Sequence, residues 1–192
     1  VPRSGGVLTE GLVGPPEHIN PVLARPNTID VDLTRLTFRG LMSMDRAFTL
    51  SPDLADKIDV SPDGKEYVIR LRPNLRWSDD TALNADDVVY TFTTLADPEF
   101  KSPLQSLFQS VTVAKRDDRT VAFTLAEPLA PFLSYLTVGI LPEDSWVDAS
   151  PQAFSLSELN LKPVGNGPFV FQNLTKDREG NIKSMQFIRN EH

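Results

Sequence analysis

The sequence predicts an α/β fold with mixed and antiparallel strands and few, short helices. Two stretches, residues 53–72 and 110–125, each read as a pair of short strands joined by a polar turn. A third stretch, residues 84–95, has the apolar spacing and the start signal of a helix. Sixteen of the 192 residues are proline, a larger share than the roughly 5% of an average chain. These prolines are spread along the sequence and limit the length of each helix and strand.

Composition excludes several classes of protein. The chain is 40% hydrophobic and 23% charged, which is typical of one globular domain or of a domain with part of another. Its net charge of −7 and its lack of a basic cluster argue against a nucleic-acid partner. The lack of cysteine excludes disulfides, thiolate metal sites and a cysteine nucleophile. The sequence has no run of about 18 apolar residues that would predict a membrane span. Residues 1–11 lack the apolar segment of a signal peptide.

The first part of the chain is expected to contain a strand, a loop and a helix. Residues 7–13 alternate in the way of a strand. Residues 14–27 hold four prolines and must be irregular, because proline donates no ladder hydrogen bond and restricts the residue before it. From Asp30, the spacing of Leu33, Leu36 and Leu41 predicts a helix, with Gly40 as its stop.

The rest of the chain alternates between hairpins and short helices. The turn SPDG precedes a strand in which Tyr67, Ile69 and Leu71 share one face. Residues 111–113 and 121–125 are the arms of a hairpin around KRDDR, and the last part of the chain forms another around DREGN. A short, buried helix is expected from about Pro131.

Four carboxylates in the stretch WSDDTALNADD raise the question of a catalytic or metal site. Asn84 is a good N-cap, and Asp87 three residues later is its capping-box partner. Asp86 also lies in the first helical turn, where negative charge favours the helix dipole. Asp79 and Asp80 are typical turn residues. Adjacent helix positions point about 100° apart, so we expect these acids to build the fold, and a carboxylate-dependent hydrolase is the least favoured function.

The two histidines do not define a site. His18 stands beside Glu17, and His192 is the last residue, so a set of metal ligands is not expected. No G-x-S-x-G motif presents a serine nucleophile. We therefore predict no catalytic residue, no metal site and no cofactor.

Six motifs follow one another in a characteristic order. They are GLVGPPEHINPVLA, DLTRLTFRGLMSMD, LSPDLADKIDVSPDGKEYVIRLRPNLRWSDDTALNADDVVYTFTTLADPEFKSPL, TVAFTLAEPLAPFL, GILPEDSW and KPVGNGPFVF. In content and order the chain resembles the bacterial extracellular solute-binding proteins of family 5, the peptide- and nickel-binding receptors of ABC importers. The resemblance covers nearly the whole chain, and the long central motif is the most specific. Asp80 replaces a glycine that is usual in the family, and Phe169 stands where tyrosine is common.

The resemblance implies lobe one of a two-lobe periplasmic-binding-protein-like fold (type II, cluster C), with mixed sheets and short helices. Residues 1–36 and 163–192 would be parts of one hinge-connected subdomain, lying together as one sheet region. Residues 37–162 would form a small extra subdomain. Family members continue beyond this length, so the second lobe, which supplies most of the side chains that specify the ligand, is expected to be absent from this chain.

The same resemblance implies the substrate-binding component of an ABC importer. It would capture peptides or similar small solutes outside the membrane and deliver them to the permease subunits. The protein would be exported to the periplasm or the cell surface, with lipid anchoring of the precursor left open. A partial lobe is expected to self-associate, because an unpaired strand edge invites another strand. An envelope interaction or chaperone-like module on the same fold stays the alternative.

The family pattern places the ligand against the residues that follow Asn20 and Pro21, namely Ala24, Arg25, Pro26 and Asn27. Arg25 either pairs with a carboxylate of the ligand or is a solvated surface charge. Leu104, which follows Ser-Pro in KSPL, either adds an apolar wall to the site or belongs to the core. The prolines stiffen the first loop, which lowers the entropy lost when a ligand binds.

Overall fold

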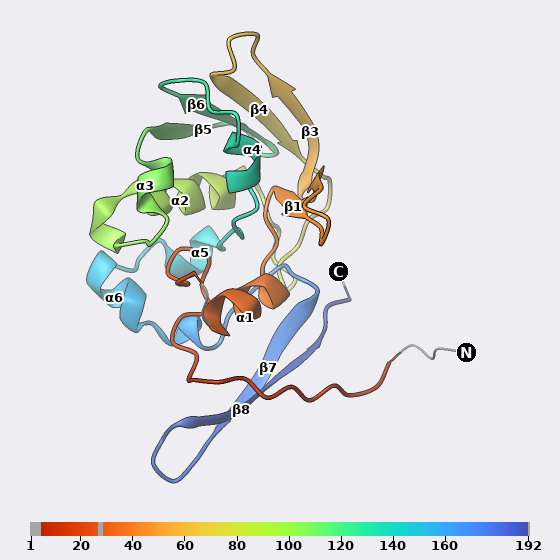
Figure 1. The fold of residues 1–192 in the computed structure, drawn as a ribbon, viewed down its shortest axis with the longest axis vertical. Helices are drawn as coiled ribbons and strands as arrows, with labels where there is room; N and C mark the ends of the chain where they lie inside the picture. The colour runs from red at the N-terminus through yellow and green to blue at the C-terminus, as the bar shows by residue number, and fades with distance from the viewer. Residues whose placement is uncertain (1–4, 27–28, 192) are drawn as a thin grey trace.

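The computed structural model describes residues 5–26 and 29–191. It has the α/β architecture that the sequence predicts, and the described residues form three separate antiparallel sheets with helices packed against them (Figure 1). The strands of this part of the chain are β1 (Met42–Met44), β2 (Leu50–Pro52), β3 (Ala55–Val60), β4 (Glu66–Leu71), β5 (Val111–Asp117), β6 (Thr120–Leu125), β7 (Phe169–Lys176) and β8 (Ile182–Arg189).

The largest sheet has the strand order β3-β4-β6-β5. In its central pair, Tyr67 lies opposite Phe123 and Ile69 lies opposite Val121. These four side chains are buried, whereas Arg70, on the other face of β4, is exposed. The alternation in the sequence therefore places one face of the sheet on the core, as expected.

Helix α2 (Ala85–Ala96) packs against β5 and β6 of this sheet. Asn84 caps the helix, because its Oδ1 accepts the N–H of Asp86 at 2.7 Å while Asp87 Oδ2 accepts the N–H of Asn84 at 2.8 Å. This is the predicted capping box. Phe92 lies edge-on to Phe123, with ring centroids 4.9 Å apart, so an aromatic contact joins the helix to the sheet.

The other helices are short and often begin beside a proline. They are α1 (Ile29–Thr37), α3 (Gln105–Phe108), α4 (Phe132–Tyr135), α5 (Glu143–Trp146) and α6 (Pro151–Leu156), with 3-10 turns η1 (Pro98–Phe100) and η2 (Glu158–Asn160). The predicted helix after Pro131 is α4. Over residues 5–26 and 29–191, no helix is long and apolar enough to cross a membrane.

Residues 165–167 bring the last part of the chain against the end of α1. The N–H of Gly167 donates to the carbonyl of Thr37 at 2.8 Å, and the N–H of Arg39 donates to Asn166 Oδ1 at 2.8 Å. A Cβ atom on Gly165 would stand 1.9 Å from the carbonyl oxygen of Thr37, so this approach requires glycine. From this joint, β7 and β8 form the predicted hairpin, which extends away from the other elements (Figure 1).

Two expectations for the N-terminal region are wrong. Residues 7–13 form no strand, since no other described segment pairs with them, and Val7 and Val13 are 95% and 100% exposed. The first helix ends at Thr37 instead of Gly40, because Gly40 forms a β-bridge with Gly139. The N-terminal region therefore contacts β7 through α1 and, within the described residues, adds no strand to the β7–β8 sheet.

Asp87 is a buried carboxylate that ties three segments together. It accepts the N–H of Asn84 and the N–H of Glu143, each at 2.8 Å, and it hydrogen-bonds the Trp77 side chain. The starts of α2 and α5 and the turn before α2 thus meet on one side chain. Burial raises the pKa of Asp87 to about 6, although the hydrogen bonds to the carboxylate oppose the shift.

We expect Asp87 to make the free energy of unfolding depend on pH. Its pKa of about 6 in the folded chain exceeds the value of about 3.9 for an unfolded chain, so the folded state binds this proton more tightly. The resulting stabilisation is complete below about pH 3.9 and is lost as the pH rises through about 6. Urea unfolding of the chain and of Asp87→Asn should give a stability difference, wild type minus variant, that falls between about pH 4.5 and about pH 7.5. A constant or rising difference would contradict the assignment.

Candidate ligand-binding site

A cavity of about 600 Å³, here called the first cavity, lies between α1, the proline-rich loop and the segment after α4. Its volume is suited to a small ligand. The lining is mostly apolar and comes from segments that are far apart in the sequence: Leu12, Val13, Pro21, Ala24, Pro26, Ile29, Val31, Asp32, Thr34, Arg35, Leu104, Thr137, Val138 and Gly139.

Asn20 fixes the loop that forms one wall of the first cavity. Its side chain is fully buried, with Oδ1 accepting the N–H of Val22 at 2.9 Å and Nδ2 donating to Asn160 Oδ1 at 3.0 Å. The carbonyl of Asn20 accepts the N–H of Ala24 at 2.8 Å, so the chain turns tightly just before the lining residues. A buried amide without hydrogen-bond partners destabilises the folded protein, so other conformations of the loop that break these bonds are disfavoured.

One hydroxyl group joins this loop to the segment before α3. Ser102 is buried, its Oγ donates to the carbonyl of Val22 at 2.6 Å, and the same oxygen accepts the N–H of Leu104 at 3.2 Å. Leu104 is thereby held at the cavity on which Ala24 and Pro26 also border.

The segment 137–139 forms another wall of the first cavity. A Cβ atom on Gly139 would lie 2.6 Å from the Cβ of Phe38 and 3.0 Å from the Cγ of Pro21, so this segment approaches both only because residue 139 is glycine. Gly139 also pairs with Gly40 in the bridge described above. Close packing between Gly139 and Pro21, which both border the cavity, therefore fixes the two walls relative to each other.

Helix α1 supplies the polar side of the first cavity. Its position is fixed at the start by Asp30, a buried carboxylate that accepts the N–H groups of residues 17 and 18 at 2.9 and 3.1 Å. Asp32 and Arg35 line the cavity with exposed charges of opposite sign. The hydroxyl of Thr34 is buried and has no hydrogen-bond partner among the described residues.

The structure brings three of the five predicted site residues to one place. Ala24, Pro26 and Leu104 line the first cavity. Arg25 has an exposed side chain and does not belong to the lining. Asn27 lies outside the described residues. Contact of these residues with a ligand stays a prediction.

Sequence reasoning missed the groups that hold the site together. Asn20, Ser102 and Asn160 read as ordinary loop residues, since their side chains find partners only after folding. The wall at residues 137–139 was equally hidden in an apolar stretch. Its one signal was Gly139 between apolar residues, a pattern that often marks a close backbone approach.

The acidic cluster near Trp77 has structural partners. Asp79 Oδ1 accepts the N–H and the hydroxyl of Thr81 at 3.1 and 2.6 Å, and Asp86 pairs with Lys115 at 2.7 Å. Within the part of the chain that the structure describes, no group of three or more His, Cys, Asp or Glu side chains could hold a metal ion. The first cavity, by contrast, offers noncovalent contacts: apolar walls for the body of a ligand and polar groups for its ends.

The chain belongs to the bacterial extracellular solute-binding proteins of family 5, since the model described as "Bacterial extracellular solute-binding proteins, family 5 Middle" matches residues 49–192. It is 35% identical over 192 residues to the dipeptide-binding protein of Escherichia coli (strain K12), and the match covers 85% of this chain and 35% of that protein. It is 32% identical over 195 residues to di/tripeptide-binding protein 1 of Pseudomonas aeruginosa, covering 88% and 36%. The chain thus spans about a third of the length of these relatives.

Solved structures agree with this assignment. NikZ of Campylobacter jejuni, in complex with Ni(L-His), superimposes with a TM-score of 0.80 at 29% identity, covering 91% of this chain and 33% of that one. AgaA of A. tumefaciens R10, in complex with agropinic acid, gives a TM-score of 0.80 at 27% identity, covering 94% and 35%. The chain therefore has the fold of part of a periplasmic binding protein, as the sequence predicts.

We expect Asn20→Ala to lower the free energy of unfolding by roughly 1–3 kcal/mol, because it leaves the buried N–H of Val22 and the Oδ1 of Asn160 without a partner. Urea unfolding at neutral pH measures the loss. Asn173→Ala is the matched control, since its side chain makes only an exposed hydrogen bond to Gln186 at 3.2 Å, and it should change stability by less than about 0.5 kcal/mol. Equal losses in the two variants would show that Asn20 is not an anchor.

Proposed function

We propose that this chain is part of the substrate-binding component of an ABC importer, which captures peptides or similar small solutes outside the membrane and delivers them to permease subunits. The observation that carries the proposal is the convergence of Ala24, Pro26 and Leu104 on one mostly apolar cavity. Names of relatives support the ligand class, since two of them are described as dipeptide- or di/tripeptide-binding proteins. The proposal assigns no catalytic residue, no metal, no cofactor and no nucleic acid to the chain.

We also propose how the chain is divided. Residues 1–36 and 163–192 belong to a hinge-connected subdomain of lobe one, and residues 37–162 form the small extra subdomain. The close approach of Gly167 to the carbonyl of Leu36, together with the contact of α1 with β7, supports the first grouping, because it joins segments from both ends of the chain. The relatives are about three times as long, which supports a second lobe elsewhere in such proteins. In a two-lobe receptor the ligand is buried between the closed lobes. One lobe alone covers much less of the ligand surface, so this chain by itself binds weakly.

The proposed ligand contacts are Ala24, Arg25, Pro26, Asn27 and Leu104. Arg25 lies in the sequence between the lining residues Ala24 and Pro26, and it pairs with the carboxylate of a ligand that reaches the rim of the cavity. Location follows from the family description, which names extracellular proteins, so we propose export to the periplasm or the cell surface. The proposal includes both a freely exported protein and one whose precursor is anchored by a lipid.

Leu104→Glu tests the site. It places a carboxylate in the apolar wall, and we expect binding of dipeptides to weaken at least about tenfold, because an unpaired charge is costly to desolvate. Saturation-transfer NMR with a dipeptide mixture detects binding even in the millimolar range and identifies the retained members. Leu107→Glu is the control, since Leu107 is 38% exposed on α3 and lies outside the lining.

The two leucine variants separate the alternatives. Binding lost only in Leu104→Glu supports a solute receptor. Binding equal in both variants would place the ligand elsewhere and contradict the proposed contacts. Capture of unfolded protein in place of peptides would favour the chaperone-like alternative.

We expect the chain to self-associate through the β7–β8 hairpin. Among the described residues this sheet has only two strands, and Phe169 and Ile188 are 40% and 44% exposed on it. Unpaired edges with apolar side chains favour strand pairing between copies. Sedimentation equilibrium should show an average mass that rises with concentration, and Ile188→Lys should reduce the rise. A concentration-independent monomer mass in the unchanged chain would exclude self-association.

A further inference from the structure

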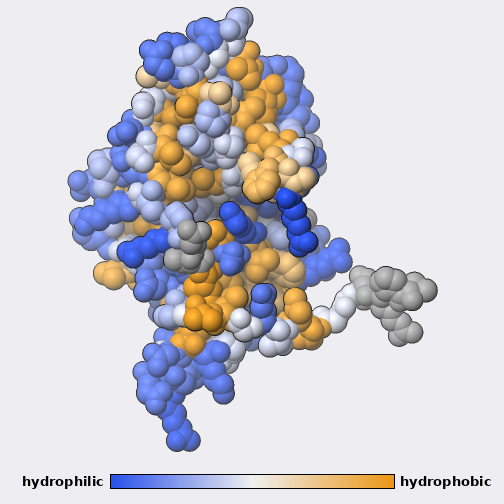
Figure 2. Space-filling model, viewed as in Figure 1, coloured by the Kyte–Doolittle hydropathy of each residue, from blue (hydrophilic) through white to orange (hydrophobic). Residues whose placement is uncertain are grey.

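A second cavity, of about 970 Å³, lies between the end of α1, the β1–β2 hairpin and the base of the β7–β8 hairpin. It borders on the first cavity, because Arg35 and Thr137 line both. Figure 2 shows this side of the molecule, with hydrophobic surface over β1 and strongly hydrophilic side chains below it. Nothing in the function proposed above uses this second cavity.

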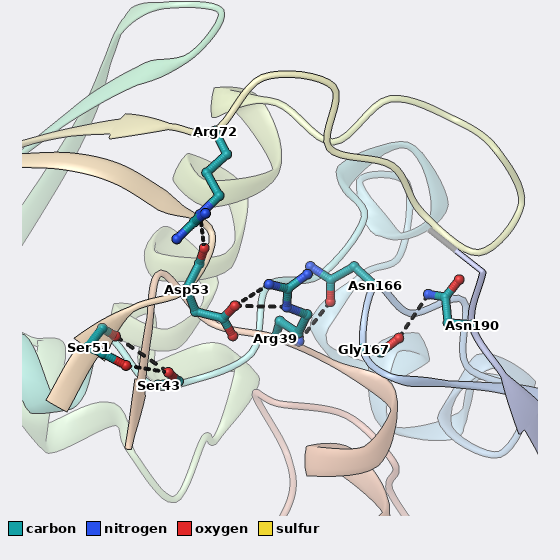
Figure 3. Close-up of polar contacts among 8 residues, drawn as sticks. All are labelled: Arg39, Ser43, Ser51, Asp53, Arg72, Asn166, Gly167 and Asn190. Atoms are coloured by element: carbon teal, nitrogen blue, oxygen red, sulfur yellow. Dashed lines mark hydrogen bonds and ion pairs between the residues drawn. The ribbon is translucent and has the colours of Figure 1, made fainter. Parts of the chain in front are cut away.

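Positive charge is in excess in the second cavity. Three arginines line it, and among the described residues only Arg39 has an acidic partner. It forms an ion pair with Asp53 through Nε at 2.9 Å and through a second nitrogen (Figure 3). The other acid, Asp45, accepts two backbone N–H groups of the β1–β2 turn at 2.8 Å each. Among the described residues, Arg35 and Arg189 make no hydrogen bond or ion pair through their side chains. Two guanidinium groups are therefore left for an anion.

A buried amide at the same cavity also lacks an acceptor. Asn166 is 5% exposed, and its Oδ1 accepts the N–H of Arg39 at 2.8 Å, which fixes the orientation of the amide (Figure 3). Its Nδ2 then has no partner among the residues that the structure describes. A buried donor without an acceptor is costly and uncommon in native proteins. An acceptor oxygen brought in by a ligand removes this cost.

The rim of the second cavity is apolar. Phe48, Met44 and Phe169 line it with side chains that are 83%, 44% and 40% exposed. Phe48 has a backbone φ of 60°, in the left-handed region where a residue other than glycine is strained. A strained turn that presents an exposed aromatic ring next to unpaired arginines has the composition of a binding surface, since aromatic residues, methionine and arginine are enriched there.

We propose that the second cavity binds a carboxylate that carries an aromatic or similar apolar group. The carboxylate pairs with Arg189 and Arg35 as a charge-assisted contact. A small shift of the buried Asn166 amide lets its Nδ2 donate to the same anion. The apolar group packs on Phe48 and Phe169 at the rim. This site adjoins the proposed peptide site and shares Arg35 with it, but Arg189 and Phe48 line only the second cavity.

Phenylacetate and its uncharged analogue phenylacetamide test the charge requirement. Ligand-observed NMR titration of the chain should give binding of phenylacetate and at least about tenfold weaker binding of phenylacetamide, the usual consequence of losing a charge-assisted contact. Arg189→Gln should remove the same preference. Arg178→Gln is the control, because Arg178 is exposed in the turn of the β7–β8 hairpin and lies outside the second cavity.

Phe48→Gly separates binding from stability. Glycine adopts φ of 60° without strain, so the variant should unfold at the same temperature as the unchanged chain or at a higher one, while phenylacetate binding weakens severalfold. The proposal is overturned if phenylacetate does not bind, if phenylacetamide binds equally well, or if Arg189→Gln and Arg178→Gln behave alike. These outcomes do not depend on Leu104, so the importer function stands or falls separately.

Discussion

The contact of residues 165–167 with the end of α1 is the constraint on which the rest of the structure depends. Two glycines allow backbone to touch backbone there, and Asn166 between them accepts an N–H just beyond the helix. The N–H of Ser78 donates to the carbonyl of Gly165 at 2.8 Å, so the turn after Trp77 is held at the same point. The position of α1 relative to the large sheet and to the β7–β8 hairpin follows from this joint, and α1 borders both cavities.

Most of the local structure could be predicted from the sequence, because local signals determine it. The hairpins are specified by alternation and turn residues, and α2 by its capping box and apolar spacing. Segment 7–13 also alternates, but a strand needs a neighbour, and no described segment provides one. Helices α5 and α6 have four and six residues, too few for a periodic signal, and depend on the packing of Trp146 against Phe154 at a ring distance of 4.5 Å.

The candidate site was less predictable than the fold. Ala24, Pro26 and Leu104 could be grouped only through resemblance to a family, since none of them has a chemical signature of binding. Their convergence depends on buried bonds such as Asn20 to Asn160, which joins positions 140 residues apart. The acidic cluster shows the opposite case. Its residue types suggest chemistry, yet spacing and helix position already identified Asn84 and Asp87 as a cap.

Separate residues anchor the first cavity and line it, and this division has an evolutionary consequence. The anchors are buried side chains such as Asn20 and Ser102, whereas the residues that face the cavity make few bonds that the fold requires. Apart from Gly139, which the packing requires to be glycine, residues of the lining can therefore mutate at little cost in stability, while mutations in the anchors are removed by selection. A scaffold of this kind can diverge in ligand while keeping its backbone. The related folds that hold Ni(L-His) and agropinic acid are consistent with such drift.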